Sequence, residues 1–209
     1  TGISIVNLGA SSALHHPAGP DRTKSIDEAK QFIDLAQALD CPFIRVFPNN
    51  LPKDQEKQKT LDLIKEGMTT LGNYANASGV SVLMETHGDV VYTDDLVNIM
   101  QDVNHPRTGL VWDIINMWSV TKETPAQVYP KLKPFIRHTH IKDFKMKDGK
   151  MQYTLLGKGE SPIYQAIDLL RKDEFKGYYS FEWEKLWHHE IEEPEIALAS
   201  YAYTMKYLK

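Results

Sequence analysis

The heptapeptide RHTHIKD at residues 137–143 brings two imidazoles, an ammonium and a carboxylate together in a segment that otherwise has the apolar character of a buried strand. Successive side chains of a strand point to opposite faces, so His138, His140 and Lys142 share one face. An imidazole is a common metal ligand, and an ammonium can hold an anion or a hydroxyl-rich molecule. The spacing therefore indicates a polar site on one face of this strand.

Similar polar side chains stand near the C-terminal ends of the other expected strands. In chain order these are Arg45, then Glu85 and His87, then Asp113 and Asn116, and finally Glu182 and Glu184. One acid at a strand end is more often a loop cap or a surface charge, and one histidine in a strand is more often a hydrogen-bonded core residue. Here, consecutive strands each carry an acid or an imidazole at the same end. This pattern indicates a shared cation, because the negative charges of carboxylates that lie close together must be neutralised.

Three carboxylates and one imidazole form the expected metal-ligand set: Glu85, Asp113, His140 and Glu182. This set suits one divalent metal ion, either Mn²⁺, Mg²⁺ or Co²⁺, with Zn²⁺ as a further candidate. With His140 as the ligand, His138 and Lys142 are available to hold an anionic or polyhydroxyl molecule. A structural role for His138 is equally compatible with the sequence.

Six short apolar runs rich in β-branched residues must position these groups. They cover residues 3–8, 43–47, 80–86, 109–114, 136–141 and 178–183. Helical patterns lie between or after them, over about residues 26–39, 61–75, 94–103, 125–132, 161–171 and 194–207. Strands that alternate with helices indicate a parallel sheet, because a parallel pair needs a crossover connection. The expected fold class is α/β.

Turn and cap signals mark the ends of some elements. Ser25 with Glu28 has the spacing of a capping box, and Ser161 followed by Pro162 resembles an N-cap and first helical residue. Asp148-Gly149 lies between two short extended runs and predicts a small hairpin within 144–156.

The order of elements fits either a doubly wound open sheet or a TIM-type (β/α) barrel. No Gly-rich phosphate loop follows the first strand, as a dinucleotide-binding half would require. Polar groups also gather at the ends of many strands rather than at one switch point. In a barrel those ends converge on one axis, so the sequence favours the barrel.

Composition narrows the function further. The chain has 209 residues, is 42% hydrophobic and 25% charged, and carries a net charge of −4 without a basic block, which argues against a nucleic-acid partner. The single Cys41 excludes an intramolecular disulfide and a cysteine metal cluster. No apolar run approaches the roughly 20 residues of a membrane helix, and the chain opens on a strand-like segment without a signal peptide. The default expectation is a cytoplasmic protein.

Four runs carry a family resemblance: VLMETHGD, GLVWDIIN, HTHIKD and SFEWE. They resemble the metal-ligand strands of the xylose isomerase-like barrel superfamily, which includes sugar phosphate isomerases and epimerases, inosose dehydratases and apurinic endonucleases. The LLGKGES loop (155–161) resembles the Gly-rich turn before that family's penultimate helix. The resemblance extends over nearly the whole chain and is specific for the superfamily rather than for one substrate.

This resemblance implies an isomerase or epimerase that acts on a sugar, a sugar phosphate or a related polyol through an enediolate. Glu85 and Glu182 would bind the metal and also serve as the acid/base pair, with Asp113 and His140 as ligands only. Residues expected to orient the substrate are His87, Asn116, His138, Lys142 and Arg45, although Arg45 is equally compatible with a salt bridge inside the barrel. Two alternatives stay open: a non-catalytic metal- or sugar-binding remnant, and an inosose dehydratase-type lyase.

The sequence departs from the family pattern in two respects. Asn116 stands where a histidine often follows the strand aspartate, and the segment after His140 lacks the Asp-x-His pair of the endonucleases, which argues against DNA cleavage. We also count about six parallel strands where the family has eight, and the first resembles the third strand of the family. We therefore expect one incomplete TIM-type barrel domain over residues 1–209 that lacks the first two βα units. Three explanations stay open: a truncated gene product, a barrel completed by a partner chain as in a homo-oligomer, and strands supplied by rearranged termini.

Overall fold

Six strands form one parallel sheet in the computed structural model, which describes residues 2–208. The strands are β1 (Leu8–Ala13), β2 (Phe43–Phe47), β3 (Ser81–Glu85), β4 (Thr108–Asp113), β5 (Ile136–Ile141) and β8 (Tyr178–Phe181). Hydrogen bonding orders them β1-β2-β3-β4-β5-β8, so each strand pairs with its neighbours in chain order. This arrangement confirms the expected α/β class with six parallel strands.

Helices follow the strands along the chain. They are α1 (Pro20–Ala38), α2 (Lys57–Ala75), α3 (Thr93–Val103), α4 (Ile114–Thr121), α5 (Pro125–Leu132), α6 (Ile163–Lys172) and α7 (Pro194–Tyr207). Between β5 and α6 lies an antiparallel hairpin of β6 (Asp143–Lys147) and β7 (Lys150–Thr154). Within the described residues, every helix is too short or too polar to cross a membrane.

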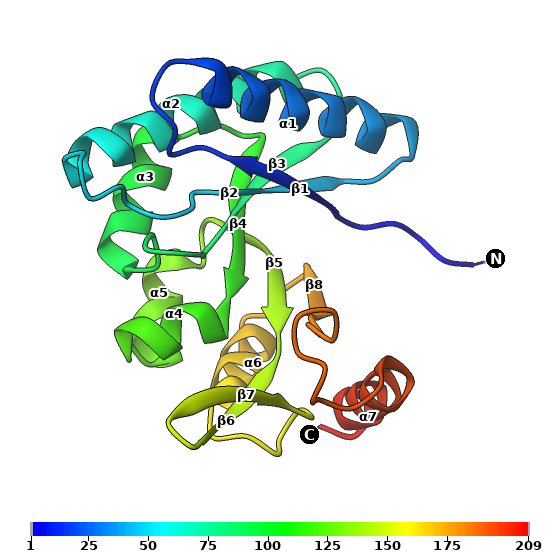
Figure 1. Cartoon of the computed structure of the whole chain (residues 1–209). Helices are drawn as coiled ribbons and strands as arrows, with labels where there is room; N and C mark the ends of the chain where they lie inside the picture. The colour runs from blue at the N-terminus through cyan, green and yellow to red at the C-terminus, as the bar shows by residue number, and fades with distance from the viewer. Residues whose placement is uncertain (1, 209) are drawn as a thin grey trace. The chain divides into compact units, whose positions relative to one another are not determined.

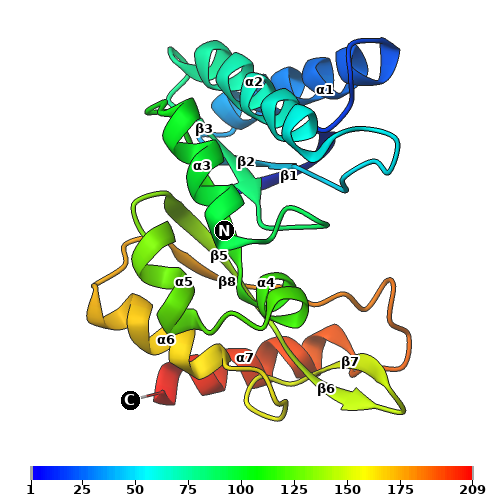
Figure 2. The same ribbon diagram turned by 90° about the vertical axis from the view of Figure 1, so that its left-hand side faces the viewer.

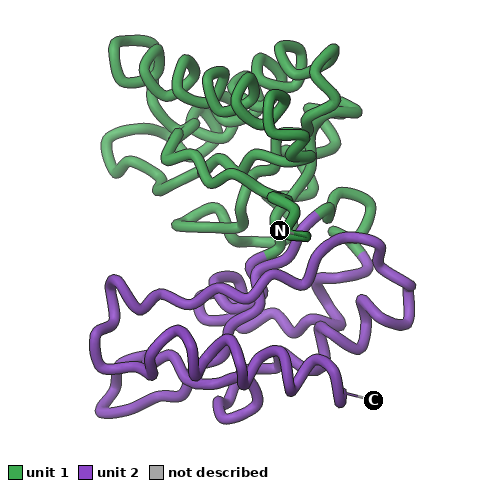
Figure 3. Tube along the Cα trace, turned by 90° about the vertical axis from the view of Figure 1, so that its right-hand side faces the viewer, with its two compact units in different colours: residues 1–112, 131–137 green, residues 113–130, 138–209 purple. Residues whose placement is uncertain are grey.

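The chain divides into two compact units, coloured separately in Figure 3. Unit 1 ends at residue 112 and also takes in residues 131–137, whereas unit 2 comprises residues 113–130 and the chain from residue 138 onward. The strands β4 and β5 each pass from one unit into the other. The single domain expected over residues 1–209 stays a prediction.

In unit 1, α1 packs against β1 and β2, and α2 packs against β3 and α3 (Figure 1). The core consists of β-branched and long apolar side chains with no exposed surface, among them Ile44, Val46, Val82, Leu83 and Met84 from the strands. A stripe of α2 with a helical period covers them: Ile64, Met68, Leu71 and Ala75. Burial of these two apolar faces holds the ends of β2 and β3 in register.

In unit 2, α4 packs against α6, and β5 pairs with β8. The apolar face of α6 is fully buried through Ile163, Ala166, Ile167 and Leu170. The hairpin β6–β7 is visible in Figure 2, and its turn places Asp148 and Gly149 at positive φ angles of 51° and 75°. Aspartate and glycine tolerate this region of backbone space, so the predicted hairpin is confirmed.

The predicted first strand at residues 3–8 is wrong. Strand β1 begins at Leu8, where pairing with β2 starts, and it buries the small side chains of Ala10, Ser12 and Ala13. Ile3 and Ile5 instead lie outside the sheet and are 82% and 46% exposed. The alternating β-branched pattern therefore predicted strand propensity correctly but not the partner strand, which decides where pairing begins.

The two predicted helix starts are also wrong. Helix α1 begins at Pro20, so Ser25 lies inside it, and Glu28 accepts a hydrogen bond from Ser12 rather than closing a capping box. Helix α6 begins at Ile163, because the Ser161 hydroxyl donates to the Asp143 carboxylate instead of capping the helix. In both cases a tertiary hydrogen bond replaces the local one.

Asp143 holds the segment 155–161 against the end of β5. Its buried carboxylate accepts hydrogen bonds from the backbone N–H groups of Phe144 (2.9 Å), Gly157 (3.0 Å) and Gly159 (3.0 Å) and from the Ser161 hydroxyl (2.6 Å). A Cβ atom at position 159 would collide with this carboxylate, which explains the glycine. These four hydrogen bonds to Asp143 fix the chain immediately after Lys142.

We expect Asp143→Asn to lower the free energy of unfolding by about 2–4 kcal/mol, because a neutral amide weakens several charge-assisted bonds and turns an N–H group toward donors. Urea denaturation measures this change. The matched control is Asp148→Asn, since Asp148 is exposed in the hairpin turn and asparagine tolerates its backbone conformation. Equal stability losses in the two variants would contradict the stabilising role of the Asp143 hydrogen bonds.

Candidate metal centre

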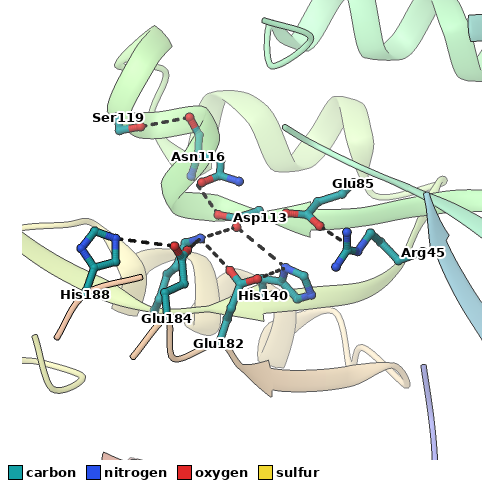
Figure 4. Close-up of polar contacts among 10 residues, drawn as sticks. Arg45, Glu85, Asp113, Asn116, Ser119, His140, Glu182, Glu184 and His188 are labelled. Atoms are coloured by element: carbon teal, nitrogen blue, oxygen red, sulfur yellow. Dashed lines mark hydrogen bonds and ion pairs between the residues drawn. The ribbon is translucent and has the colours of Figure 1, made fainter. Parts of the chain in front are cut away.

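Asp113 lies at the point where β4 ends and α4 begins. Its side chain is fully buried and caps α4, because one carboxylate oxygen accepts a hydrogen bond from the Asn116 backbone N–H at 2.8 Å. This N-cap hydrogen bond to the first turn of the helix holds the Asp113 side chain in place. The second oxygen, Oδ2, is directed at residues from β5, as Figure 4 shows for His140.

His140 and Glu182 come to Asp113 from two paired strands. In the parallel register, Ile141 is opposite Phe181, and the Glu182 backbone N–H donates to the Ile141 carbonyl at 3.0 Å. The His140 Nδ1 atom lies 3.8 Å from Asp113 Oδ2 and 3.4 Å from Glu182 Oε1 (Figure 4). Potential ligand atoms of Asp113, His140 and Glu182 thus lie within 4.8 Å of one another.

Lys142 occupies the middle of a group of acids. Its Nζ atom lies 2.9 Å from Asp113, 2.6 Å from Glu182 and 3.0 Å from Glu184, and its side chain is only 2% exposed. An ammonium group has three N–H donors, so each donor can face one carboxylate. This arrangement is an ion-pair cluster at the end of β5 and β8.

The pKa values of two of these groups depend on each other. Burial by itself would raise the pKa of Asp113, but the Lys142 ammonium and then His140 outweigh it and hold the pKa of Asp113 well below its ordinary value. Burial would likewise lower the pKa of Lys142, but the Asp113 and Glu182 carboxylates raise it well above its ordinary value. Both groups are therefore charged at neutral pH.

Two neighbours complete the cluster on its outer side. His188 lies with Nε2 3.7 Å from Glu184 (Figure 4), and the Tyr153 ring lies 5.4 Å from the Lys142 Nζ atom. The sequence placed Glu184 at a strand end without assigning it a role, and Tyr153 was not predicted. The alternation of SFEWE does place Glu184 on the face of Glu182, whereas Tyr153 reaches the site from the hairpin and left no signal in the sequence.

The donor set fits a divalent cation. Two carboxylates and one imidazole converge from adjacent strand ends, which is a mixed oxygen and nitrogen set suited to Mn²⁺, Mg²⁺, Co²⁺ or Zn²⁺. In unit 2, three carboxylates face one ammonium, which leaves two negative charges. One divalent ion would neutralise them. Asp113, His140 and Glu182 are the residues that would hold it.

Unit 1 carries three of the predicted strand-end residues, Arg45, Glu85 and His87. Glu85 is the last residue of β3, and its Oε2 atom lies 3.2 Å from the Arg45 Nε atom (Figure 4). The Arg45 guanidinium also lies over the Phe47 ring at 3.9 Å, and the Phe47 ring is 4.7 Å from the His87 ring. The predicted alternative of a salt bridge at Arg45 is thus confirmed, and the Arg45 guanidinium orients the Glu85 carboxylate.

The predicted residues fall into two sets. Unit 2 brings together Asp113, His140, Lys142 and Glu182, with Asn116 bound to Asp113 through its backbone N–H. Unit 1 brings together Arg45, Glu85 and His87. His138 is buried in β5, with its ring 5.9 Å from the His140 ring. Substrate roles for His87, Asn116 and His138 stay predictions.

Comparison with known families decides the ancestry. The sequence profile described as "Xylose isomerase-like TIM barrel" matches residues 1–207, almost the entire chain. The chain belongs to the xylose isomerase-like TIM-barrel family. The resemblance in the four strand-end runs is therefore confirmed, and the six strands correspond to a TIM-type barrel fold.

Solved structures share the xylose isomerase-like fold at low sequence identity. A xylose isomerase domain protein from Planctomyces limnophilus is 22% identical with a TM-score of 0.77, over 98% of this chain and 76% of that one. A xylose isomerase-like TIM barrel protein from Mycobacterium smegmatis, in complex with magnesium, is 20% identical with a TM-score of 0.78, over 98% and 73%. A 3-keto-D-glucoside 4-epimerase from E. coli is 14% identical with a TM-score of 0.77, over 100% and 80%.

No curated protein sequence matches the chain significantly. The solved structures of similar fold also include a probable 3-DHS dehydratase from Bacillus anthracis, which is 18% identical, so the likeness to solved structures shows the fold rather than one reaction. The expected absence of a nucleic-acid partner, the homo-oligomer and the cytoplasmic location stay predictions.

Proposed function

We propose that the protein is a divalent-metal-dependent isomerase or epimerase of a sugar, a sugar phosphate or a related polyol. The observation that carries this proposal is the convergence of Asp113, His140 and Glu182 at the ends of adjacent strands. We further propose Glu85 as the fourth ligand, since it ends β3, the strand that pairs with β4. When bound, the ion supplies Lewis-acid stabilisation of the negative charge that develops on substrate oxygens.

The two glutamates differ from Asp113 in a way that supports an acid/base role. The Glu182 side chain keeps 27% of its surface exposed, whereas the Asp113 side chain is fully buried. A base must reach a substrate proton, so Glu182 is suited to proton transfer and Asp113 to holding the site. Glu85 is proposed as the second acid/base group, with its carboxylate oriented by Arg45.

Proton transfer next to a carbonyl accounts for the reaction. One glutamate removes a proton from the carbon beside the carbonyl, an enediolate forms, and a proton is returned from one of the two glutamates. Return to the other face gives an epimer, and return to the neighbouring carbon gives an isomer. Side chains proposed to orient the substrate directly are His87, Asn116 and His138. Lys142 and Arg45 are proposed to orient it indirectly, because they position the carboxylates that they bind.

Three relatives by fold support this choice of chemistry. Besides the 3-keto-D-glucoside 4-epimerase, they include a D-allulose 3-epimerase from Methylomonas sp. and a D-psicose 3-epimerase in the presence of D-fructose. Their identities to this chain are 14%, 15% and 16%, so they support the reaction class rather than a particular sugar.

Solvent deuterium exchange tests the proposal. The chain is loaded with Mn²⁺ and incubated in D₂O with a panel of ketoses, aldoses and their phosphate esters, and proton NMR follows the signal of the proton on the carbon beside the carbonyl. We expect exchange of that proton and appearance of an epimer or isomer for at least one sugar. Loss of water with a new enone absorbance would indicate the lyase alternative, and absence of exchange from every sugar would indicate a non-catalytic binding protein.

A further inference from the structure

We infer that the site selects an uncharged sugar or polyol over a sugar phosphate. The inference rests on the proposed function and narrows its substrate class. Its basis is that the cationic side chains placed at the strand ends are already bound by carboxylates of the chain itself. Among the described residues, a phosphate group at the ion-pair cluster of unit 2 would therefore meet carboxylates and a lysine that these carboxylates already bind.

Lys142 is the first of these cations. Its ammonium has three N–H donors, and three carboxylate oxygens lie within 3.0 Å of it, from Asp113, Glu182 and Glu184. Its side chain is also almost completely buried. A phosphate could reach this ammonium only by displacing a carboxylate, so Lys142 acts on the substrate through the carboxylates that it positions.

Arg45 is the second cation, and in unit 1 it is likewise committed. Its Nε atom faces Glu85 at 3.2 Å, and the plane of its guanidinium covers the Phe47 ring. The next lysine after the last ligand strand, Lys185, donates to the backbone carbonyls of His189 and Ile191 and pairs with a glutamate. These contacts use the cations for internal structure.

The charge of the cluster in unit 2 leads to the same preference. One divalent ion would bring the three carboxylates and one ammonium to neutrality, so a phosphate would add about two uncompensated negative charges. Hydroxyl groups carry no charge and donate hydrogen bonds to carboxylates such as Glu182 and Glu184. A polyhydroxyl molecule thus matches these carboxylate acceptors, and its phosphate ester does not.

Calorimetric titration of matched sugar pairs tests the inference. The Mn²⁺-loaded chain is titrated with D-fructose and D-fructose 6-phosphate, and with D-tagatose and D-tagatose 6-phosphate, while metal content is measured on the same sample. We expect the uncharged member of a pair to bind at least about tenfold more tightly, as expected from one close like-charge contact. Equal or tighter binding of the phosphate would overturn the inference.

A variant pair links the preference to Lys142. Glu184→Gln removes one carboxylate from the ammonium, so we expect the preference for the uncharged sugar to fall severalfold. The matched control is Glu190→Gln, because Glu190 contacts His188 rather than Lys142, and we expect its preference to equal that of the unchanged chain. An equal fall in both variants would contradict the role of Lys142.

Two further outcomes keep the inference separate from the proposed function. Lys158 is exposed in the segment 155–161, so phosphate binding that disappears in Lys158→Ala would identify this lysine as an anion contact and overturn the inference alone. Absence of binding by both members of every pair, in a sample that holds its metal, would contradict the proposed function as well.

Discussion

Glu182→Gln is expected to reduce solvent deuterium exchange by about 10²–10⁴-fold, because an amide cannot accept a proton from the substrate. The substitution preserves the size of the side chain and one oxygen that can face the Lys142 ammonium, 2.6 Å away in the unchanged chain. Metal binding should therefore weaken but persist. The measurement is the rate of deuterium incorporation by NMR, with metal content determined on the same sample.

Glu190→Gln is the matched control for this experiment. It makes the same chemical change in the same loop region, but its carboxylate is exposed and pairs with His188 on the outer side of the cluster. We expect its exchange rate to stay within a factor of about two of the unchanged chain. Undiminished exchange in Glu182→Gln would exclude Glu182 as the base.

Lys142→Met has the largest expected effect on stability. Without metal, we expect the free energy of unfolding to fall by about 3–5 kcal/mol, because removal of one partner leaves buried carboxylates uncompensated. Asp113 is the most affected, since its side chain is fully buried and its pKa depends on Lys142. Urea denaturation at pH 7, with the ion removed by chelation, measures the loss.

The choice of pH follows from the direction of the two pKa shifts. The raised pKa of Lys142 contributes stability that is fully present below its unfolded pKa and lost as pH rises through the folded value. The lowered pKa of Asp113 contributes stability present above its unfolded pKa and lost as pH falls through the folded value. At pH 7 both contributions are complete.

The exposed neighbour Lys145 provides the control, and Lys145→Met should change the free energy of unfolding by less than about 0.5 kcal/mol. Saturating Mn²⁺ should restore part of the stability of Lys142→Met, since a ligand that binds only the folded state stabilises it. Similar stabilities of the two methionine variants without metal would contradict the account of the ion-pair cluster.

Sequence periodicity predicted the elements that bury regular apolar faces. Strands 43–47 and 136–141 and helix 125–132 have the bounds that the structure shows. Helix α4 was not predicted, because IINMWSVT is apolar on most sides and lacks a helical stripe. Strand β1 was displaced because its position depends on pairing with β2 rather than on its own propensity.

The candidate site was predictable where strand register determines it. Asp113, His140 and Glu182 stand at the ends of strands, so the parallel sheet brings them to one edge and the sequence reveals them. The partners of Lys142 were not predictable, because three carboxylates from separate segments must approach one ammonium. Such ion pairing depends on tertiary packing, which no local pattern encodes.

Metal analysis of the purified chain is the decisive test of the proposed metal centre. Plasma mass spectrometry is applied to the unchanged chain and to Asp113→Ala/His140→Ala, with a size-exclusion mass from the same sample to verify folding. We expect about one divalent ion per unchanged chain and loss of this ion in the double variant. A folded, unchanged chain that binds no metal after incubation with Mn²⁺, Mg²⁺, Co²⁺ or Zn²⁺ would contradict the proposed metal centre.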